Sequence, residues 1–357
     1  MSRPTDLHIN LDALQHNFNQ VCNLAPNSKV LAMIKANAYG HGLKRVAKAL
    51  QSADAFGVAC LEEAKIIREV GLDNPIILMV GFFDQDDLQK IIDLNCEIII
   101  HHLAQVEALE KVRLISPIKV WLKIDTGMHR LGVDPEQAEE IYARLIKCKN
   151  VLGTPKVLTH FADADDPSKL TTQKQIDVFE QVTANLAGEK SLANSAGILA
   201  FPQSHADWVR PGGLLYGVST LPGDVGANHN LKPVMTLSSK IIALRKCHKN
   251  DAIGYGGIWS CPEDMPVGVV AIGYGDGYPR HARCGTSVLV NNHICPLIGR
   301  VAMDMLAVDL RSYSDAKIGD EVILWGKDLP VEKVAESSDT VIYELLCGIA
   351  RRVRGAE

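Results

Sequence analysis

Reactive side chains recur in this sequence at or shortly after short apolar runs that are rich in β-branched residues. Six residues have this position: Lys35, Arg130, His160, Asn194, Ser195 and Arg210. A lysine amine can bond to a carbonyl compound, a histidine can transfer protons and an arginine can hold an anion. One such residue alone is more often an ordinary surface or structural residue. Six together predict an active site at the carboxyl ends of parallel strands, where barrel enzymes keep theirs.

A glycine-rich turn follows the last of these runs, in the segment RPGGLLYG at residues 210–217. Barrels frequently build a phosphate site at this point from backbone N–H groups and a helix start. Gly212 also fits a simple tight turn, because glycine accepts backbone conformations that other residues avoid. The segment is therefore a candidate phosphate site.

Eight short strands have to position these residues. They are expected at residues 30–35, 55–60, 75–80, 97–102, 119–124, 156–161, 192–197 and 208–213. Stretches with helical spacing of apolar residues lie between them, for example residues 61–71 and 173–187. The alternation predicts an α/β protein with a parallel sheet, and eight units favour an N-terminal (β/α)8 TIM-type barrel. An open doubly wound sheet is the alternative.

The composition changes around residues 223–233, GDVGANHNLKP, and the helical period gives way to alternating strands. We therefore expect a barrel domain over residues 1–228 and a mainly β C-terminal domain over residues 229–357. Asn291 and Asn292 stand between two β-rich runs and predict a hairpin turn. A last helix is expected from about Thr340 through YELLCGIARR.

The bulk composition excludes several classes of protein. A net charge of −5 without a lysine-rich block gives no electrostatic footprint for nucleic acid or for an anionic membrane. The nine cysteines are scattered and have no zinc-ligand spacing, so no metal is expected and free thiols in a reducing cytoplasm fit best. The first ten residues, MSRPTDLHIN, lack the apolar core of an export signal.

Several segments together resemble bacterial alanine racemases. MIKANAYGHG (33–42) is similar to the family's signature around the lysine that carries pyridoxal 5'-phosphate (PLP). Similar segments follow in order: WLKIDTGMHRLG (121–132), THFADAD (159–165), NSAG (194–197), VRPGGLLYG (209–217), AIGYGG (252–257), IGYGDGYPR (272–280) and VAMDM (301–305). Because they cover both expected domains, the resemblance extends to nearly the entire chain.

The resemblance implies a two-base racemisation of alanine, with Lys35 bound to PLP as a Schiff base. Lys35 then acts on one face of Cα and Tyr255 on the other. A free phenol is a poor base at neutral pH, so Tyr255 needs help, and His160 is implied as its hydrogen-bond partner. Arg210 is implied to face the pyridine nitrogen, where a guanidinium keeps its proton and weakens the electron sink.

The remaining roles also follow from the resemblance. Arg130 is implied to orient the substrate carboxylate, and Lys123 matches a lysine that the family often carbamylates, although it also fits an ordinary lysine at a strand end. The cofactor-binding positions are implied to be Tyr39, Asn194, Ser195, Gly212 and Gly213, and the walls of the substrate entrance Tyr274, Met303 and Asp304. Some relatives have a phosphate-binding tyrosine near the C-terminus, where this chain offers Arg351.

Tyr255 and the three entrance residues reach the active site from the second subunit of a homodimer in this family. The expected function is the supply of D-alanine for peptidoglycan. Three alternatives remain: a PLP-binding barrel without catalysis, an amino-acid decarboxylase on a similar two-domain plan, and a broad-specificity amino-acid racemase. The expected C-terminal domain and Tyr255 argue against the first, and no decarboxylase motif is evident where AIGYGG and VAMDM stand.

Overall fold

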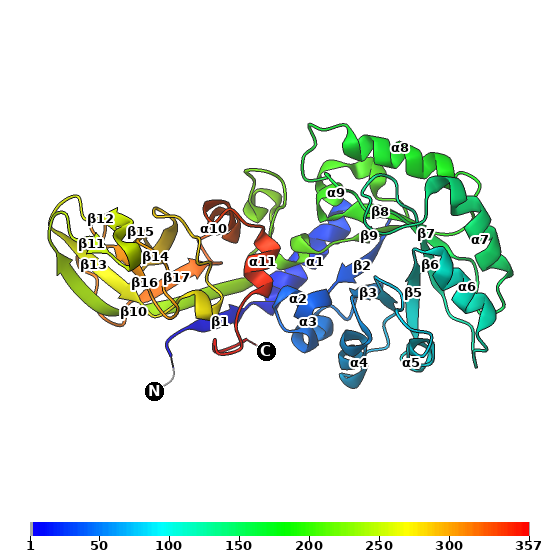
Figure 1. Cartoon of the computed structure of the whole chain (residues 1–357), viewed down its shortest axis with the longest axis horizontal. Helices are drawn as coiled ribbons and strands as arrows, with labels where there is room; N and C mark the ends of the chain where they lie inside the picture. The colour runs from blue at the N-terminus through cyan, green and yellow to red at the C-terminus, as the bar shows by residue number, and fades with distance from the viewer. Residues whose placement is uncertain (1–2, 357) are drawn as a thin grey trace.

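Eight parallel strands close into a barrel in the computed structural model, which describes residues 3–356 (Figure 1). They are β2 (Lys29–Met33), β3 (Ala55–Val58), β4 (Ile76–Leu78), β5 (Cys96–Ile100), β6 (Val120–Lys123), β7 (Lys156–Leu158), β8 (Lys190–Asn194) and β9 (Trp208–Arg210). The barrel closes where Lys29 and Val30 of β2 pair with Trp208 and Val209 of β9. The expected TIM-type barrel is thereby confirmed.

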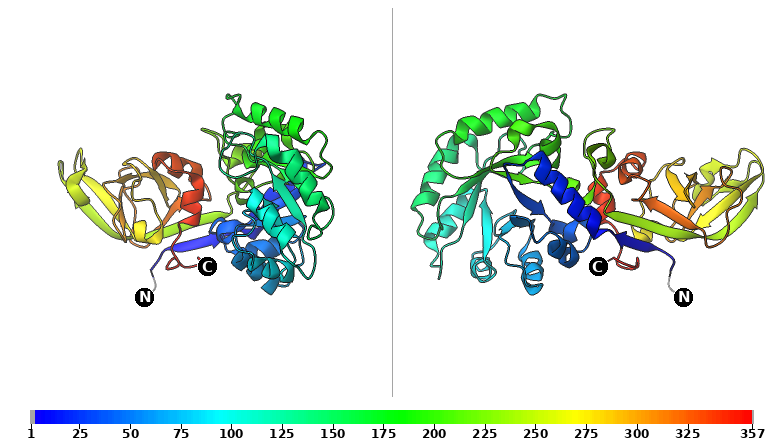
Figure 2. Two further views of the ribbon diagram at one scale, coloured as in Figure 1. Left: turned by 45° about the vertical axis from the view of Figure 1, so that its right-hand side comes forward. Right: turned by 180° about the vertical axis from the view of Figure 1, so that it is seen from behind.

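Helices cover the outside of the barrel (Figure 2). They are α1 (Leu11–Leu24), α3 (Leu43–Ala49), α4 (Leu61–Glu69), α5 (Asp87–Asp93), α6 (Leu103–Lys111), α7 (Ala138–Lys147), α8 (Thr171–Thr183) and α9 (Ser195–Ala200). Their apolar faces bury Leu14, Val46 and Leu109 against the outward side chains of the strands. Inside the barrel, Leu31, Ile99 and other inward side chains form a separate core. The barrel is thus a packed scaffold that fixes the ends of its strands.

Several expected strands are too long at their carboxyl ends. Residues 156–161 and 208–213 were expected to be extended, but β7 ends at Leu158 and β9 at Arg210. The interval 192–197 was expected to be extended, but β8 ends at Asn194 and α9 begins at Ser195. The side chain of Asn194 accepts the N–H of Gly197 at 2.9 Å and so caps the helix. A capping residue at the strand end therefore stops the strand.

The second domain is a mainly antiparallel sheet, as expected. Its strands are β1 (Asp6–Ile9), β10 (Met235–Cys247), β13 (Met265–Val270), β14 (Ser287–Val290), β15 (His293–Ile298), β16 (Leu306–Asp309) and β17 (Glu321–Trp325), and a small hairpin adds β11 (Ala252–Ile253) and β12 (Trp259–Ser260). The sheet order is β1-β10-β13-β16-β15-β14-β17, and β17 returns to pair with β10. The predicted turn between β14 and β15 is confirmed, since Asn291 and Asn292 both have positive φ.

The chain crosses between the two domains more than once. β1 pairs with β10 in the second sheet, so the N-terminal segment runs beside C-terminal strands (Figure 1). The helices α10 (Val331–Ser337) and α11 (Ile342–Cys347) come late in the chain, and α11 returns to contact the barrel. We keep the division between residues 228 and 229 as a proposal for the main domain boundary, with β1 as a segment that belongs to the second sheet.

The last helix is shorter than the sequence suggests. It was expected to run through Arg352, but α11 ends at Cys347 and Gly348 follows as its cap. α11 also packs closely against the barrel at Gly40. A Cβ on Gly40 would lie 2.1 Å from the carbonyl oxygen of Leu346, so only glycine allows this approach.

Within residues 3–356, no helix is long and apolar enough to cross a membrane.

Candidate active site

A cavity of about 750 Å³ opens at the carboxyl ends of the barrel strands. The site residues expected in the barrel gather around it: Lys35, Tyr39, Lys123, Arg130, His160, Asn194, Ser195, Arg210 and Gly212. Gly213 follows at the start of the 3-10 turn η3 (Gly213–Tyr216). Residues spread over more than 170 positions of sequence thus meet because the barrel brings its strand ends together.

Lys35 begins a helical turn of unusual hand, α2 (Lys35–Tyr39). The four residues 36–39 have φ between 52° and 54°, the left-handed conformation, which costs roughly 1–2 kcal/mol for each L-residue. The surroundings hold this turn: the carboxylate of Glu63 accepts the backbone N–H of Asn37 at 3.3 Å. The turn leaves both Lys35 and Tyr39 on the wall of the cavity.

Five basic side chains line the cavity, and burial together with the neighbouring charges lowers the pKa of three of them. Burial and then Arg130 lower the pKa of Lys35. Burial, Arg210 and Arg130 lower the pKa of Lys123 to about 8. Burial and Arg210 hold the pKa of His160 well below its usual range. The site therefore favours a neutral imidazole and makes both lysines easier to deprotonate.

Arg210 is buried but has only neutral hydrogen-bond partners among the described residues. Its Nη1 donates to Ser191 Oγ at 2.6 Å, and its Nη2 donates to the carbonyl oxygens of Thr159 at 2.6 Å and Leu192 at 3.0 Å. Burial lowers its pKa to about 10, which still leaves the guanidinium protonated at neutral pH. A fixed positive charge therefore stands at the cavity without a carboxylate to balance it.

Small residues and hydroxyls form a cradle at one end of the cavity. Ser195 Oγ accepts the backbone N–H of Gly212 at 2.8 Å. A Cβ on Gly212 would lie 2.9 Å from Tyr39 Oη, and a Cβ on Gly213 would lie 3.0 Å from Tyr343 Oη. The two glycines thus keep the space before both phenols open.

Tyr343 is a cavity residue that the sequence reasoning missed. The sequence offered Arg351 for a C-terminal contact, with a site that manages without this contact as the alternative. Arg351 is exposed and does not line the cavity, whereas Tyr343 does. The reason is that α11 ends at Cys347 and the chain turns away after it, so only α11 faces the barrel. The sequence shows a tyrosine in YELLC, but it does not show that α11 returns to contact α2 of the barrel.

The residues expected from the second domain do not reach this cavity within one chain. Tyr255, Met303 and Asp304 line a separate hollow of about 670 Å³ on the second domain. Tyr274 lies on the 3-10 turn η6 (Tyr274–Asp276) and stacks with Arg280, whose Cζ is 5.9 Å from the ring centre. The side chains of Tyr255 and Met303 are 69% and 53% exposed. Two groups of expected site residues therefore stand on two faces of the same chain.

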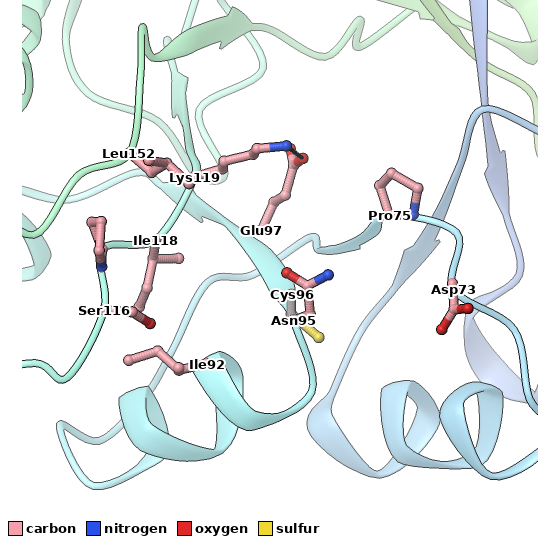
Figure 3. A pocket seen from close by; sticks show the side chains of 11 residues that line it. Asp73, Pro75, Ile92, Asn95, Cys96, Glu97, Ser116, Ile118, Lys119 and Leu152 are labelled. Carbon is pink, nitrogen blue, oxygen red and sulfur yellow. Dashed lines mark ion pairs between the residues drawn. The ribbon is translucent and has the colours of Figure 1, made fainter.

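A smaller recess of about 100 Å³ lies at the opposite ends of the barrel strands, around the starts of β5 and β6 (Figure 3). Two carboxylates line it, Asp73 and Glu97, and Glu97 is already satisfied, because it accepts from Trp121 Nε1 at 2.7 Å and pairs with Lys156 at 2.9 Å and Lys119 at 3.8 Å. These contacts give Glu97 a structural role at the amino-terminal ends of the barrel strands.

A closed parallel barrel whose strand ends collect a lysine, a histidine and arginines that have no carboxylate partner within residues 3–356 defines an enzyme of the TIM-barrel class with a site for anionic ligands. Two family models match the chain: "Alanine racemase, N-terminal domain" over residues 9–220 and "Alanine racemase, C-terminal domain" over residues 234–356. The chain belongs to the alanine racemase family, which is a family of isomerases.

Individual relatives agree over the full length. The chain is 52% identical to the alanine racemase of Coxiella burnetii (strain RSA 493 / Nine Mile phase I), over 98% of this chain and 97% of that protein. It is 51% identical to the biosynthetic alanine racemase of Escherichia coli O6:H1, over 97% of this chain and 96% of that protein. The crystal structure of biosynthetic alanine racemase from Pseudomonas aeruginosa superimposes with a TM-score of 0.96 at 41% identity, over 99% and 98% of the two chains.

Proposed function

We propose that this chain interconverts L- and D-alanine with PLP held in the barrel cavity. The observation that carries the proposal is the charge of that cavity. Among the described residues, Lys35, Lys123, Arg130, His160 and Arg210 converge on it and none of them forms an ion pair with a carboxylate. Such a site calls for anionic ligands.

The residues present fit PLP and an amino acid. The cradle suits a phosphate, because hydroxyl groups face an open space beside glycine backbone. The hydroxyls belong to Ser195, Tyr39 and Tyr343, and a Cβ on Gly212 or Gly213 would fill the space. Asn194 supports the cradle by capping α9. When bound, PLP withdraws electrons from the substrate and makes its Cα proton acidic.

Lys35 anchors the cofactor and serves as the base on one face of Cα. Its lowered pKa suits both tasks, because an amine must be neutral to act as a nucleophile or to take a proton. Arg130 binds the substrate carboxylate beside it and keeps Cα within reach of the amine.

The opposite face of Cα belongs to the partner subunit's Tyr255. Tyr255 is largely exposed and away from Lys35 in its own chain, which fits a residue that completes another subunit's site. His160 then accepts or donates a hydrogen bond at the phenol. The functional unit in this proposal is a homodimer with two shared sites, walled at the entrance by Tyr274, Met303 and Asp304.

Arg210 keeps the reaction confined to proton transfer. A guanidinium facing the pyridine nitrogen holds its own proton and leaves that nitrogen unprotonated, so the electron sink stays weak. Its four polar neighbours fix its position. A weak sink suppresses side reactions such as transamination, which suits an enzyme that only moves a proton.

Lys123 is a site for carbamylation. With a pKa of about 8 it has a reactive fraction of neutral amine near neutral pH. Addition of its nitrogen to CO2, with loss of one proton, gives a carbamate anion. That change replaces a cation that repels Arg130 with an anion that holds it in place.

We place the activity in the cytoplasm and assign its product, D-alanine, to peptidoglycan. A reducing compartment suits nine cysteines that are all free thiols. Two of the similar proteins carry the word biosynthetic in their names, which favours supply of D-alanine over its breakdown.

The decisive experiment is a racemisation assay over a panel of L-amino acids with added PLP. We expect turnover confined to alanine, with at most weak turnover of serine. Comparable rates on large side chains would favour a broad-specificity racemase instead, and release of CO2 would identify a decarboxylase. No activity on any amino acid in the PLP-loaded protein would overturn the proposal.

A further inference from the structure

A single buried carboxylate fastens the loop that carries Tyr274. Asp276 ends the turn η6, and its side chain is fully buried. Its Oδ2 accepts the backbone N–H of Gly273 at 3.0 Å and pairs with Arg3 Nη2 at 2.8 Å. Its Oδ1 pairs with Arg352 Nε at 2.8 Å. One carboxylate is therefore gripped by two arginines that stand 349 positions apart in the sequence.

The same two arginines also hold the neighbouring loop, residues 301–305. Arg3 Nη2 donates to the carbonyl oxygen of Asp304 at 2.9 Å. Arg352 Nη2 donates to Asp304 Oδ1 at 2.8 Å and to the carbonyl oxygen of Met303 at 3.4 Å. Each guanidinium thus bridges the turn η6 and this second loop.

The two loops are also locked to each other through their backbones. Tyr274 N–H donates to the carbonyl oxygen of Ala302 at 3.0 Å, and Gly275 N–H donates to that of Met303 at 2.9 Å. A Cβ on Gly275 would lie 2.6 Å from Arg352 Nη2, so glycine lets the guanidinium approach. The loops and the arginines form one closely fitted unit.

The charges explain why this unit has one geometry. A buried carboxylate that loses its cation is strongly unfavourable, whereas the pairs around Asp276 and Asp304 balance two cations with two anions. Arg352 contacts Asp276 Oδ1 as an ion pair without hydrogen-bond geometry, and it donates a hydrogen bond to Asp304 Oδ1. On the outer side, Tyr274 and Met303 stay 38% and 53% exposed. The ion pairs at Asp276 are thus buried, while Tyr274 and Met303 stay exposed on the surface of the domain.

We propose that Arg3, Asp276 and Arg352 form a clamp that positions Tyr274, Met303 and Asp304 for the active site of the partner subunit. The inference rests on the proposed function, in which these three residues wall the other subunit's substrate entrance. The clamp residues do not touch substrate or cofactor. They are positioning residues, and they join the two ends of the chain to the shared site.

Kinetics of Arg352→Ala test the clamp, with Arg354→Ala as the matched control. Arg354 lies two residues further on and pairs with Asp6 at 3.0 Å, outside the clamp. We expect KM for L-alanine to rise about tenfold in Arg352→Ala with kcat within about twofold, because entrance walls affect binding while Lys35 and Tyr255 are untouched. Arg354→Ala should match the wild type. An unchanged KM in Arg352→Ala would overturn the clamp.

Two further variants separate geometry from charge and from folding. Arg352→Lys keeps the charge but cannot contact Asp276 and Asp304 together, so it should retain the raised KM. Arg3→Ala should change KM in the same direction from the other end of the chain. Hydrogen exchange gives a readout besides activity: the amides of Tyr274 and Gly275 should exchange faster in Arg352→Ala while barrel amides do not. Full rescue by lysine, or unchanged exchange, would count against the clamp.

Hybrid dimers test whether the clamp acts on the partner. In a hybrid of Lys35→Ala and Arg352→Ala subunits, the one site that has Lys35 receives intact walls, so its KM should be normal. In a hybrid of wild type with the double variant Lys35→Ala/Arg352→Ala, the one site that has Lys35 receives unclamped walls, so its KM should be raised. The reverse pattern would mean that the clamp acts within its own subunit.

A third hybrid separates failure of the clamp from failure of the proposed function. A dimer of Lys35→Ala and Tyr255→Phe subunits contains one complete site if sites are shared, and it should recover activity that neither parent has. No recovery would overturn both the shared site and the action of the clamp in trans. Recovery here together with a normal KM in Arg352→Ala would overturn the clamp alone.

Discussion

Arg210 Nη2 lies 3.4 Å from Nδ1 of His160, at the centre of the cavity. A guanidinium can only donate, so this approach favours an unprotonated Nδ1 and a neutral imidazole. Burial and this neighbouring charge together explain why the pKa of His160 falls well below its usual range. The pair links the residue proposed to face the cofactor ring to the residue proposed to assist the second base.

The first prediction concerns that pair. In the wild type, the His160 ring should show no titration between about pH 6 and 8, because a histidine with a lowered pKa is already neutral there. Arg210→Gln removes the nearby charge and should raise the pKa. NMR of ring-labelled histidine measures both. Titration of His160 near pH 6.5 in the wild type would contradict the geometry.

The second prediction separates the two proposed bases. Lys35→Ala should lose both racemisation and the long-wavelength absorbance of lysine-bound PLP. Tyr255→Phe should keep that absorbance but lose exchange of the Cα proton on one face, because only its own proton transfer is removed. Solvent deuterium exchange with each alanine enantiomer measures the difference. Full racemisation by Tyr255→Phe would reject the two-base assignment.

The third prediction is a pH dependence of stability caused by Lys123. Its pKa is about 8 in the folded chain and 10.5 as an ordinary lysine, so the unfolded state binds more protons between these values. The free energy of unfolding of cofactor-free, CO2-depleted protein should therefore rise as pH rises from about 8 to 10.5, on the order of 3 kcal/mol. Urea titrations should show this rise in the wild type and a smaller one in Lys123→Met. Equal slopes in both proteins would exclude Lys123 as the cause.

The fourth prediction distinguishes Tyr343 from Arg351. Tyr343→Phe removes one hydroxyl from the cradle and should weaken PLP binding about tenfold, the effect of a hydrogen bond to a charged group. Arg351→Ala should leave PLP affinity unchanged, because its side chain lies outside the cavity. Dissociation constants from cofactor absorbance measure both. The opposite ranking would restore Arg351 as the contact.

Much of the barrel site was predictable from sequence, because strand ends in a parallel barrel meet at one rim. Lys35 and His160 follow within two residues of their strands and Arg210 ends its strand, and this placement was enough to bring them together. The strand error at Asn194 arose because a capping side chain overrides an extended pattern. A helix cap of this kind depends on one hydrogen bond, so it hardly changes the pattern of apolar residues from which the strand was predicted.

Other features could not be read from the sequence because they depend on contacts between distant segments. Tyr343 reaches the cavity only because α11 folds back onto the barrel through Gly40. The left-handed turn at residues 36–39 contains alanine, asparagine and tyrosine, none of which demands it, and the Glu63 contact holds it. Asp276 stands in the segment IGYGDGYPR without a role expected from sequence, because its contacts are with Arg3 and Arg352 at the two ends of the chain.

The joining of Arg3 and Arg352 at Asp276 also sets an order of events during synthesis. The eight barrel strands are complete once the ribosome has passed Arg210, but the wall of the cavity also needs Tyr343 and Cys347 from the end of the chain. The loops that carry Tyr274 and Asp304 have to wait for Arg352, because their second guanidinium arrives only then. A chain that ends before Arg352 would therefore carry all eight barrel strands but lack the guanidinium that joins the loops of Tyr274 and Asp304.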